Sequence, residues 1–367
     1  MLEEGVMYYV NDRKSRLFGR MVYSSYLKEE KWRADYDYIE PDFDFDKLEI
    51  RRELQPMIRK AGWEGIEKIL KESLCEGFFH FTDLMHLPRI FREGYIASRA
   101  LAIKNGLVKV DCISEIGKNN HVVEEEKKVQ DYARFTIQAA NPIQYNYLGF
   151  REGNCVPQPC VICVDPSIAF AWRVMFSKTN ANTGGQKYGK SSDFLSDIPI
   201  ANLQHCSCNS IEDRCAELLY PHGAPINFIK GIYFRTKGEM KHAINLTPGW
   251  FWHDLMVEDS RMFGERKDVC FLEDVSLGSK GKEDQSEFSL GSNIRFRFSL
   301  NNPDNSYVCA KVLHDGEKAG LLTRNSQSTQ TFDLNKIVRK KGDYKIKLFL
   351  IKGKYKRRIY TTNFVVE

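Results

Sequence analysis

The segment Ser210–Tyr220 places one carboxylate, Glu217, directly before the apolar run 218–220. This run predicts a short buried strand with Glu217 and Arg214 at its entry, where a polar loop can deliver side chains into a cleft. A carboxylate in that position can take part in catalysis or simply cap the loop, and most acidic residues are exposed without a catalytic role. Glu217 is therefore a candidate catalytic residue whose role depends on the residues that surround it.

A second candidate site lies in the aromatic segment 77–83. His80 and Thr82 alternate with Phe79 and Phe81, so a strand here would carry both polar side chains on one face. A lone histidine in a strand is more often a structural group than a ligand contact. The His-x-Thr pair on one face favours a binding role, next to a helix that begins after Asp83.

Six residues could in principle ligate zinc, but their spacing matches no standard zinc motif. The six are Cys155, Cys160, Cys163, His205, Cys206 and Cys208. The segment 159–164 also has the pattern of a buried strand, and cysteine is often buried in protein cores. We therefore expect no bound metal. Ten cysteines in a chain of this length, without a secretory signal, favour reduced thiols.

The elements that position these residues are short strands with few long helices between them, which predicts an α+β fold. No glycine fingerprint of a Rossmann fold is present. Apolar spacing predicts two helices over 45–75, and strands are expected near 131–138, 160–164 and 231–235. We divide the chain into an N-terminal helical extension (1–76), a central domain (77–265) and a C-terminal domain (268–367).

The C-terminal domain has short alternating strands over about a hundred residues, which predicts an all-β sandwich of the immunoglobulin type. Eleven Lys and Arg residues lie between Lys336 and Arg358, against the single acid Asp343. We predict that seven basic residues contact nucleic acid. They are Arg214, Lys345, Lys347, Lys354, Lys356, Arg357 and Arg358. The alternative is a solubilising surface whose lysines protect an exposed sheet edge.

Composition excludes several protein classes. The chain has 367 residues, of which 12% are aromatic and 28% charged, and its net charge is +5. These values are typical of globular proteins and not of disordered ones. No apolar run is long enough to span a bilayer, and the acidic start does not resemble a secretory signal. We expect a cytoplasmic protein with no membrane association.

Taken together, residues from about 77 to 253 resemble the DarT family, the NAD-dependent DNA ADP-ribosyltransferases. Four stretches carry the resemblance: Phe78–Tyr95; Asp131–Phe135 with Asn141–Tyr145; Ser177–Asn182 running to Asp193–Leu195; and Arg214–Leu219. The last is similar to the family's catalytic Arg-x-Ala-Glu element. The resemblance implies an ADP-ribosyltransferase fold, a split antiparallel β core with helices. It covers neither the first 75 residues nor the C-terminal domain.

The family likeness also implies roles for individual residues. Cleavage of the nicotinamide–ribose bond of NAD passes through an oxocarbenium-like state that a nearby carboxylate stabilises, and Glu217 resembles that carboxylate. His80 and Thr82 would hold NAD, the co-substrate. Three aromatic residues would wall the nicotinamide pocket and exclude water; they are Tyr132, Phe135 and Tyr145.

One departure from the family concerns an arginine that the family places shortly before its Asp-Tyr strand. This chain has no arginine from position 100 to 133. Lys118 or His121 could take its place in catalysis, although an amine or an imidazole deprotonates a base differently from a guanidinium.

Three functions stay open at this point. The first is an enzyme that ADP-ribosylates a nucleic-acid base, most directly in single-stranded DNA, as a toxin or anti-phage effector restrained by an antitoxin of the macrodomain type. The second is a protein ADP-ribosyltransferase. The third is a nucleic-acid-binding module with a decayed transferase domain, which the missing arginine favours and the intact Arg-x-Ala-Glu element disfavours.

Overall fold

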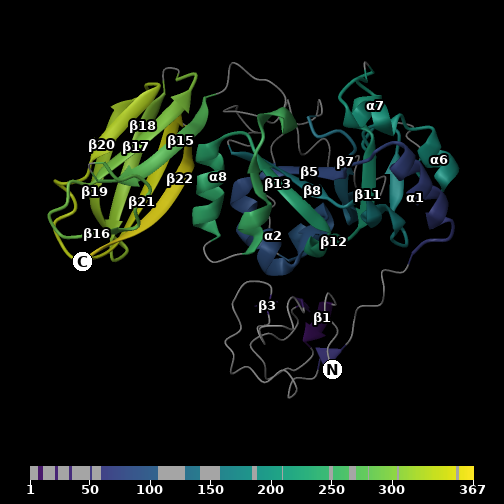
Figure 1. Cartoon of the computed structure of the whole chain (residues 1–367), viewed down its shortest axis with the longest axis horizontal. Coiled ribbons are helices and arrows are strands. Elements are labelled where there is room, and N and C mark those ends of the chain that lie inside the picture. The colour runs from purple at the N-terminus through teal and green to yellow at the C-terminus, as the bar shows by residue number, and fades with distance from the viewer. Residues whose placement is uncertain are drawn as a thin grey trace.

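The computed structural model describes most of the chain from residue 59 onward and four short strands before it. The described residues are 7–10, 21–23, 33–34, 50–51, 59–105, 129–140, 158–183, 188–208, 210–247, 251–263, 270–279, 281–303, 306–352 and 355–367. A mixed domain of helices and strands lies beside an all-β domain (Figure 1). Within the described residues, no helix is long and apolar enough to cross a membrane.

The described N-terminal segments are strands, so the predicted helical extension over 1–76 is wrong for them. The strands pair in the order β3-β2-β1-β4. They are β1 (Met7–Val10), β2 (Met21–Tyr23), β3 (Arg33–Ala34) and β4 (Ile50–Arg51). Tyrosine and valine in β1 and β2 favour extended backbone, whereas apolar spacing alone had suggested a helix across β4. The only helix described in this part is α1 (Trp63–Glu72).

One eight-stranded sheet organises the central domain in the order β10-β9-β11-β7-β5-β8-β13-β14. Its strands are β5 (Phe78–Asp83), β7 (Tyr132–Thr136), β8 (Pro159–Val164), β9 (Met175–Ser177), β10 (Tyr188–Gly189), β11 (Glu217–Pro221), β13 (Ile229–Phe234) and β14 (Met256–Glu258). Strands β5 and β7 share a single register pair, Phe79 with Thr136. The sheet is therefore nearly divided there, as expected for the predicted split core, and every pairing but β13–β14 is antiparallel.

Short helices cover this sheet, and local capping determines where they begin and end. They are α2 (Leu87–Glu93), α3 (Arg99–Lys104), α6 (Ser192–Ser196), α7 (Ile200–Gln204) and α8 (Lys237–Leu246), and a small pair of strands, β6 (Tyr95–Ala97) with β12 (Gly223–Pro225), lies beside them. As predicted, the Asp83 carboxylate accepts from the Met85 amide and begins a 3₁₀ turn, Leu84–His86, that leads into α2. Gly94 ends α2 with a φ of 76°, a left-handed conformation that glycine adopts without strain.

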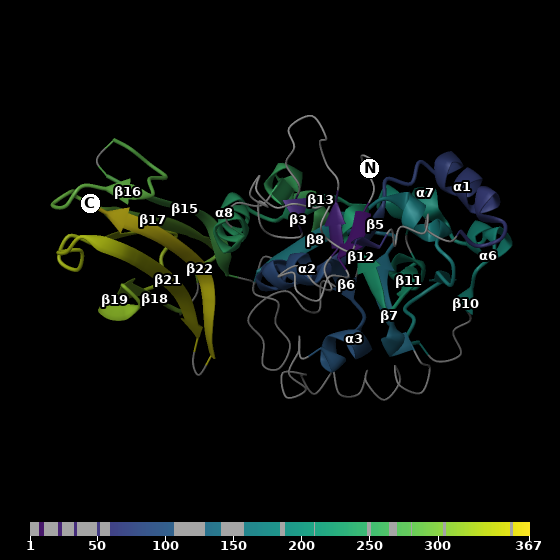
Figure 2. The same ribbon diagram turned by 90° about the horizontal axis from the view of Figure 1, so that it is seen from below.

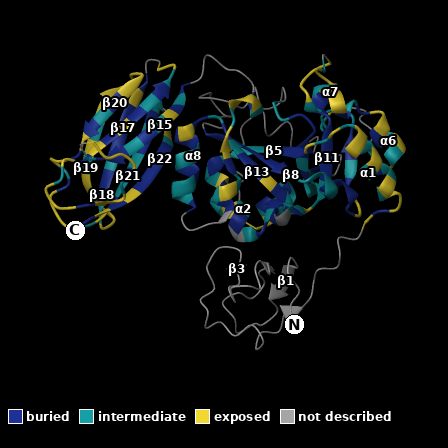
Figure 3. Ribbon diagram, in the orientation of Figure 1, coloured by how far each residue is buried: buried dark blue, intermediate teal, exposed yellow. Residues whose placement is uncertain are grey.

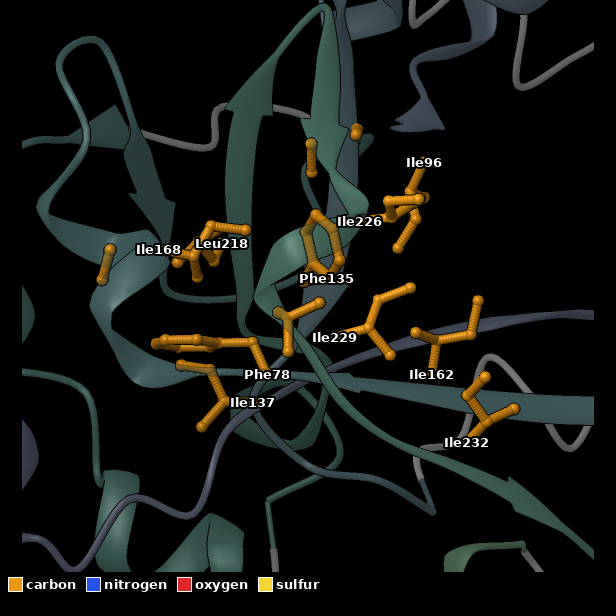
Figure 4. Close-up of a cluster of buried hydrophobic side chains, with 14 of the residues drawn as sticks. Phe78, Ile96, Phe135, Ile137, Ile162, Ile168, Leu218, Ile226, Ile229 and Ile232 are labelled. Atoms are coloured by element: carbon orange, nitrogen blue, oxygen red, sulfur yellow. The ribbon is translucent and has the colours of Figure 1, made fainter. Parts of the chain in front are cut away.

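The core of the central domain lies where the two halves of the sheet meet. Phe78, Phe135, Ile162 and Leu218 are fully buried there, from four different strands, and Figure 4 shows their side chains converging. Buried residues line the strands while exposed ones concentrate on helices and loops (Figure 3). This packing holds the strands that carry Glu217 and His80 in fixed register.

The C-terminal domain packs two antiparallel sheets around its own core, in the orders β15-β17-β20 and β16-β22-β21-β18-β19. The strands are β15 (Phe271–Gly278), β16 (Glu287–Phe288), β17 (Arg295–Asn301), β18 (Tyr307–His314), β19 (Glu317–Asn325), β20 (Thr329–Asp333), β21 (Gly342–Lys352) and β22 (Tyr355–Val366). Only β16 pairs in parallel. Strands β21 and β22 pair as an antiparallel hairpin, and the immunoglobulin type of the sandwich stays a prediction.

Helix α8 joins the two domains. It lies against β15 and β22, the strands of the two sheets nearest the central domain (Figures 1 and 2). A Cβ on Gly238 would come within 2.9 Å of Leu272 and 3.0 Å of the Glu273 backbone, so the helix and β15 are in close contact. The Lys241 ammonium donates to the Val275 carbonyl at 2.7 Å, and the Asn245 amide donates to the Tyr360 hydroxyl at 2.7 Å.

A buried polar group, His242, lies in the middle of this interface. Its Nδ1 donates to Gln158 Oε1 at 2.9 Å, the Gln158 amide donates to the Ile359 carbonyl, and the His242 ring lies 5.4 Å from the Tyr360 ring. No described group pairs with Nε2 of His242. Burial, reinforced by Arg358, lowers the pKa of His242 to about 3. The imidazole is therefore neutral at physiological pH.

This burial predicts acid sensitivity. His242 is protonated below pH 6.5 in the unfolded chain but only below about pH 3 in the folded chain. The free energy of unfolding therefore falls as the pH drops from 6.5 to 3. Between pH 6 and 4.5 we expect the unfolding free energy of the native protein to fall by about 1.4 kcal/mol per pH unit more than that of His242→Gln. Urea unfolding at several pH values measures both slopes, and equal slopes would contradict the assignment.

Candidate active site

Glu217 is the first residue of β11, between β9 and β7, as the sequence predicted for the strand. It pairs with Ser177 on one side and Thr136 on the other. Only 3% of the residue is exposed. A carboxylate this buried must be compensated by hydrogen bonds or a positive charge.

Arg134 of β7 provides that charge. Its Nη2 donates to Glu217 Oε2 at 2.6 Å and to Oε1 at 2.9 Å, and its Nε donates to Oε1 at 3.1 Å. The Ala181 amide also donates to Oε2, at 2.7 Å. Both carboxylate oxygens are therefore held by a bidentate guanidinium, the geometry that fixes a carboxylate most strongly.

The loop that follows β9 completes the setting of the pair. Asn180 Oδ1 accepts from Arg134 Nη2 at 2.9 Å, and Asn182 Oδ1 accepts from Nη1 at 3.0 Å. The Tyr188 hydroxyl donates to the Ala181 carbonyl at 2.7 Å, which anchors the same loop to β10. The rotamer of Arg134 is thus determined by groups on both sides, and through Arg134 so is that of Glu217.

His80 lies at the division of the sheet and is linked to the same arginine. Its Nδ1 is 3.0 Å from the Arg134 carbonyl oxygen. A carbonyl can only accept, so Nδ1 carries the proton and Nε2 is left as an acceptor. Burial lowers the pKa of His80, the Arg134 carbonyl opposes this, and the nearby His86 lowers it further. The ring is therefore neutral and able to accept from a ligand hydroxyl or amide.

A cavity of about 140 Å³ opens beside His80 and Thr82. Thr82 Oγ1 lies 2.9 Å from His86 Nδ1. The other polar residues of the lining are Arg89, Glu93 and Tyr95 from α2 and β6. Ligand pockets usually measure about 300–1,000 Å³, so this cavity suits one ring and its substituents, and a dinucleotide would extend beyond it.

The structure brings only some of the predicted residues to this region. His80 and Thr82 line the cavity, whereas Glu217 does not; the backbone of Arg134 contacts His80 and its side chain contacts Glu217. Phe135 is fully buried, with its ring 5.7 Å from that of His80. It therefore supports His80 from within the core, and its place in the wall of a nicotinamide pocket stays a prediction.

Two of the remaining predicted residues, Tyr132 and Arg214, lie away from the cavity, and four lie outside the described residues. Tyr132 packs with Val129, Ala181 and Leu219 near the Asn180 loop. Arg214 is half-buried in the turn before β11, and its Nε has no described hydrogen-bond partner. Lys118, His121, Tyr145 and Lys354 lie outside the described residues.

The principal residue that sequence reasoning missed is Arg134. It stands in the Asp131–Phe135 stretch already singled out, so a signal existed: an arginine in the middle of an otherwise apolar strand requires a partner. The carboxylate that pairs with it lies 83 residues away in the chain. The zinc alternative finds no support in the described residues, where no three potential ligands approach one another.

Comparison with known proteins addresses the central domain. Residues 79–259 match the family model of DarT, described as the ssDNA thymidine ADP-ribosyltransferase. No curated protein matches the chain.

Solved structures of DarT proteins are similar to this chain at low sequence identity. Thermosipho africanus DarTG in complex with ADP-ribose is 13% identical over 58% of this chain and 58% of its own, with a TM-score of 0.40. Thermus sp. 2.9 DarT in complex with ADP-ribosylated ssDNA is 12% identical over 52% of this chain and 97% of its own, with a TM-score of 0.40. Thermus sp. 2.9 DarT in complex with NAD+ is 11% identical over 52% of this chain and 98% of its own, with a TM-score of 0.38.

The Arg134–Glu217 pair predicts a specific pattern of stability. Arg134→Ala leaves a buried carboxylate with only the Ala181 amide, and loss of one partner of a buried pair costs about 3–5 kcal/mol. The double variant Arg134→Ala/Glu217→Gln removes the unpaired charge as well, so it should be more stable than Arg134→Ala alone. Chemical unfolding of the four proteins of this cycle measures the coupling, and strictly additive effects would contradict the paired geometry.

His80 predicts a binding defect that is separable from a folding defect. His80→Phe keeps a ring against Phe135 but removes the Nε2 acceptor, so the affinity for NAD should fall at least about tenfold. Thermal shift with and without NAD measures both effects. A lowered melting temperature with unchanged NAD affinity would assign His80 a purely structural role.

Proposed function

Because residues 79–259 carry a DarT-family domain, we propose that this protein is an NAD-dependent transferase that attaches ADP-ribose to thymidine in single-stranded DNA. The observation that supports the proposal is the buried Glu217 carboxylate, both oxygens of which accept hydrogen bonds from Arg134. A carboxylate fixed in this way needs no reorganisation when positive charge develops nearby, which is the condition for electrostatic catalysis.

In the reaction we propose, Glu217, His80 and Thr82 each have a separate role. The bond between the ribose and the nicotinamide of NAD breaks, nicotinamide leaves with the bonding pair, and the developing oxocarbenium charge is stabilised by Glu217. His80 accepts a hydrogen bond from NAD through Nε2. The cavity beside His80 and Thr82 takes one ring of the dinucleotide. The ring N–H nitrogen of the thymine base then attacks the anomeric carbon, the new C–N bond replaces the bond to nicotinamide, and the nitrogen's proton passes to solvent.

Arg134 supports this function in place of the arginine that the chain lacks between positions 100 and 133. The Arg134 guanidinium neutralises and orients Glu217 before NAD binds. The Arg134 side chain is 23% exposed. An arginine in this position keeps its charge at any physiological pH. The absence of an arginine before the strand therefore no longer favours a decayed, non-catalytic module.

The biological role follows as part of the same proposal. A base-modifying transferase would act as a toxin or defence effector, with a macrodomain-type antitoxin as partner and the cytoplasm as its location. Modification of protein is the alternative substrate class, and no feature of the described site favours it over nucleic acid.

Glu217→Gln tests the catalytic role because it keeps the shape of the side chain and removes its charge. We expect ADP-ribose transfer to fall by about a hundredfold or more, the usual cost of losing one electrostatic stabiliser of the transition state. The assay incubates labelled NAD with thymidine-containing single-stranded DNA, and in parallel with RNA and with protein. Glu212→Gln, an exposed carboxylate in the same loop, is the matched control and should retain full activity.

Three outcomes of this assay are decisive. Transfer by Glu217→Gln at more than about a hundredth of the native rate would remove Glu217 from catalysis. Label on protein but not on DNA would replace the proposed substrate. No label on any acceptor with the native protein would contradict the transferase function.

A further inference from the structure

The outer face of the five-stranded sheet in the C-terminal domain carries an unusual set of side chains. Strand pairing assigns alternate residues of β18, β19, β21 and β22 to this face, and the acid among them, Asp343, lies at one end of β21 opposite Val365. Six are cationic, and we call them the basic face: Lys311, Lys318, Lys345, Lys347, Lys356 and Arg358. On β21 the inward residues Tyr344, Ile346, Leu348 and Leu350 are buried, whereas Lys345 and Lys347 remain partly exposed between them.

Protection of a sheet edge does not explain this face. Strand β21 is the central strand of its sheet, with β22 on one side and β18 on the other, so Lys345 and Lys347 cannot shield an unpaired edge. Lys311 stands directly opposite Lys347, and like charges in such positions are destabilising. Burial together with Arg358, Lys345 and Lys311 lowers the pKa of Lys347. A polyanion bound across the face would relieve this repulsion.

Aromatic and apolar groups are interspersed with the cations. Tyr307 is 51% exposed and Leu321 50% exposed. Phe349 lies between the charged residues of β21 and β22, with Lys356 Nζ 4.4 Å from its ring centre. Surfaces that bind single-stranded nucleic acid combine cations for the phosphates with rings on which bases stack.

The basic face continues toward the candidate active site. Arg358 Nη2 lies 3.7 Å from Met85 Sδ, in the turn between β5 and α2, and the next residue, His86, lines the cavity with His80. Burial raises the pKa of Asp83 and Arg357 opposes this, so a second cation lies near the same turn. Figures 1 and 2 both show β22 on the side of the C-terminal domain that faces α8 and the central domain.

We infer that the basic face binds the backbone of a DNA single strand and leads that strand across the turn at Met85 to the cavity beside His80. The inference rests on the proposed function for the identity of the strand. It assigns the C-terminal domain a role in substrate binding, and its fixed attachment through α8 keeps the DNA path in register with the active site.

The test compares two charge reversals of equal size on different sheets. Lys345→Glu/Lys347→Glu alters the basic face. Arg295→Glu/Arg297→Glu alters two exposed residues at the same alternate spacing on β17, the central strand of the opposite sheet. Fluorescence anisotropy of a labelled oligothymidine, without NAD and across a range of salt concentrations, measures affinity.

We expect the lysine reversal to weaken binding at least about tenfold at low salt and to reduce the slope of log K against log salt by about 1. The arginine reversal should change affinity less than about threefold, because those residues lie off the path. Lys345→Gln/Lys347→Gln, which adds no new charge to the face, should give a smaller loss in the same direction. A thermal melt of each variant verifies that the fold is retained.

Equal affinities for the two reversals, whether both native or both weakened, would overturn the inference, because the effect would then be absent or due to net charge alone. If the native protein binds DNA through the basic face but transfers no ADP-ribose to it, the proposed function fails while the binding surface stands.

Discussion

The ion pair of Arg134 and Glu217 is the constraint on which the rest of the site depends. A carboxylate that is 3% exposed could not remain charged in this sheet without a compensating cation. Arg134 supplies it and is itself held by Asn180 and Asn182, while its backbone carbonyl fixes the tautomer of His80. Strand β11 and one loop therefore meet at the guanidinium of Arg134, and β5 meets the backbone of the same residue. The sheet is nearly divided between β5 and β7, which share one register pair, and the cavity lies beside His80 and Thr82 of β5.

The second structural constraint is the interface around α8. This helix contributes buried polar groups to both domains: Glu239 pairs with Arg235 on the central-domain side, and His242 bonds Gln158, which in turn bonds the Ile359 carbonyl of β22. Removal of the C-terminal domain would expose His242 and Gln158 and the face of α8 that packs against β15 and β22. The two domains therefore share a buried polar interface, and the proposed DNA path would depend on it.

These two constraints act together on function. The ion pair orients the proposed catalytic carboxylate, and α8 connects the domain with the basic face to the domain with the cavity beside His80. A neutral histidine and a paired carboxylate lie in the central domain, and a cluster of cations lies on the outer sheet. Such a division suits a phosphate backbone that binds by long-range attraction and a cofactor that binds by close contact.

The sequence by itself determined the local structure: the caps at Asp83 and Gly94, the strand that begins at Glu217, the alternation of His80 and Thr82, and the two-sheet C-terminal domain. Each of these depends on spacing within a few residues, or on an apolar pattern that a single segment displays. Only the tertiary structure decided that Arg134 is the partner of Glu217, that Phe135 lies in the core behind His80, and that Lys345 and Lys347 occupy a central strand. The physical reason is that register and burial depend on residues distant in the chain. A pattern of alternation shows that two side chains share a face, but not which strand lies opposite or whether that face meets solvent.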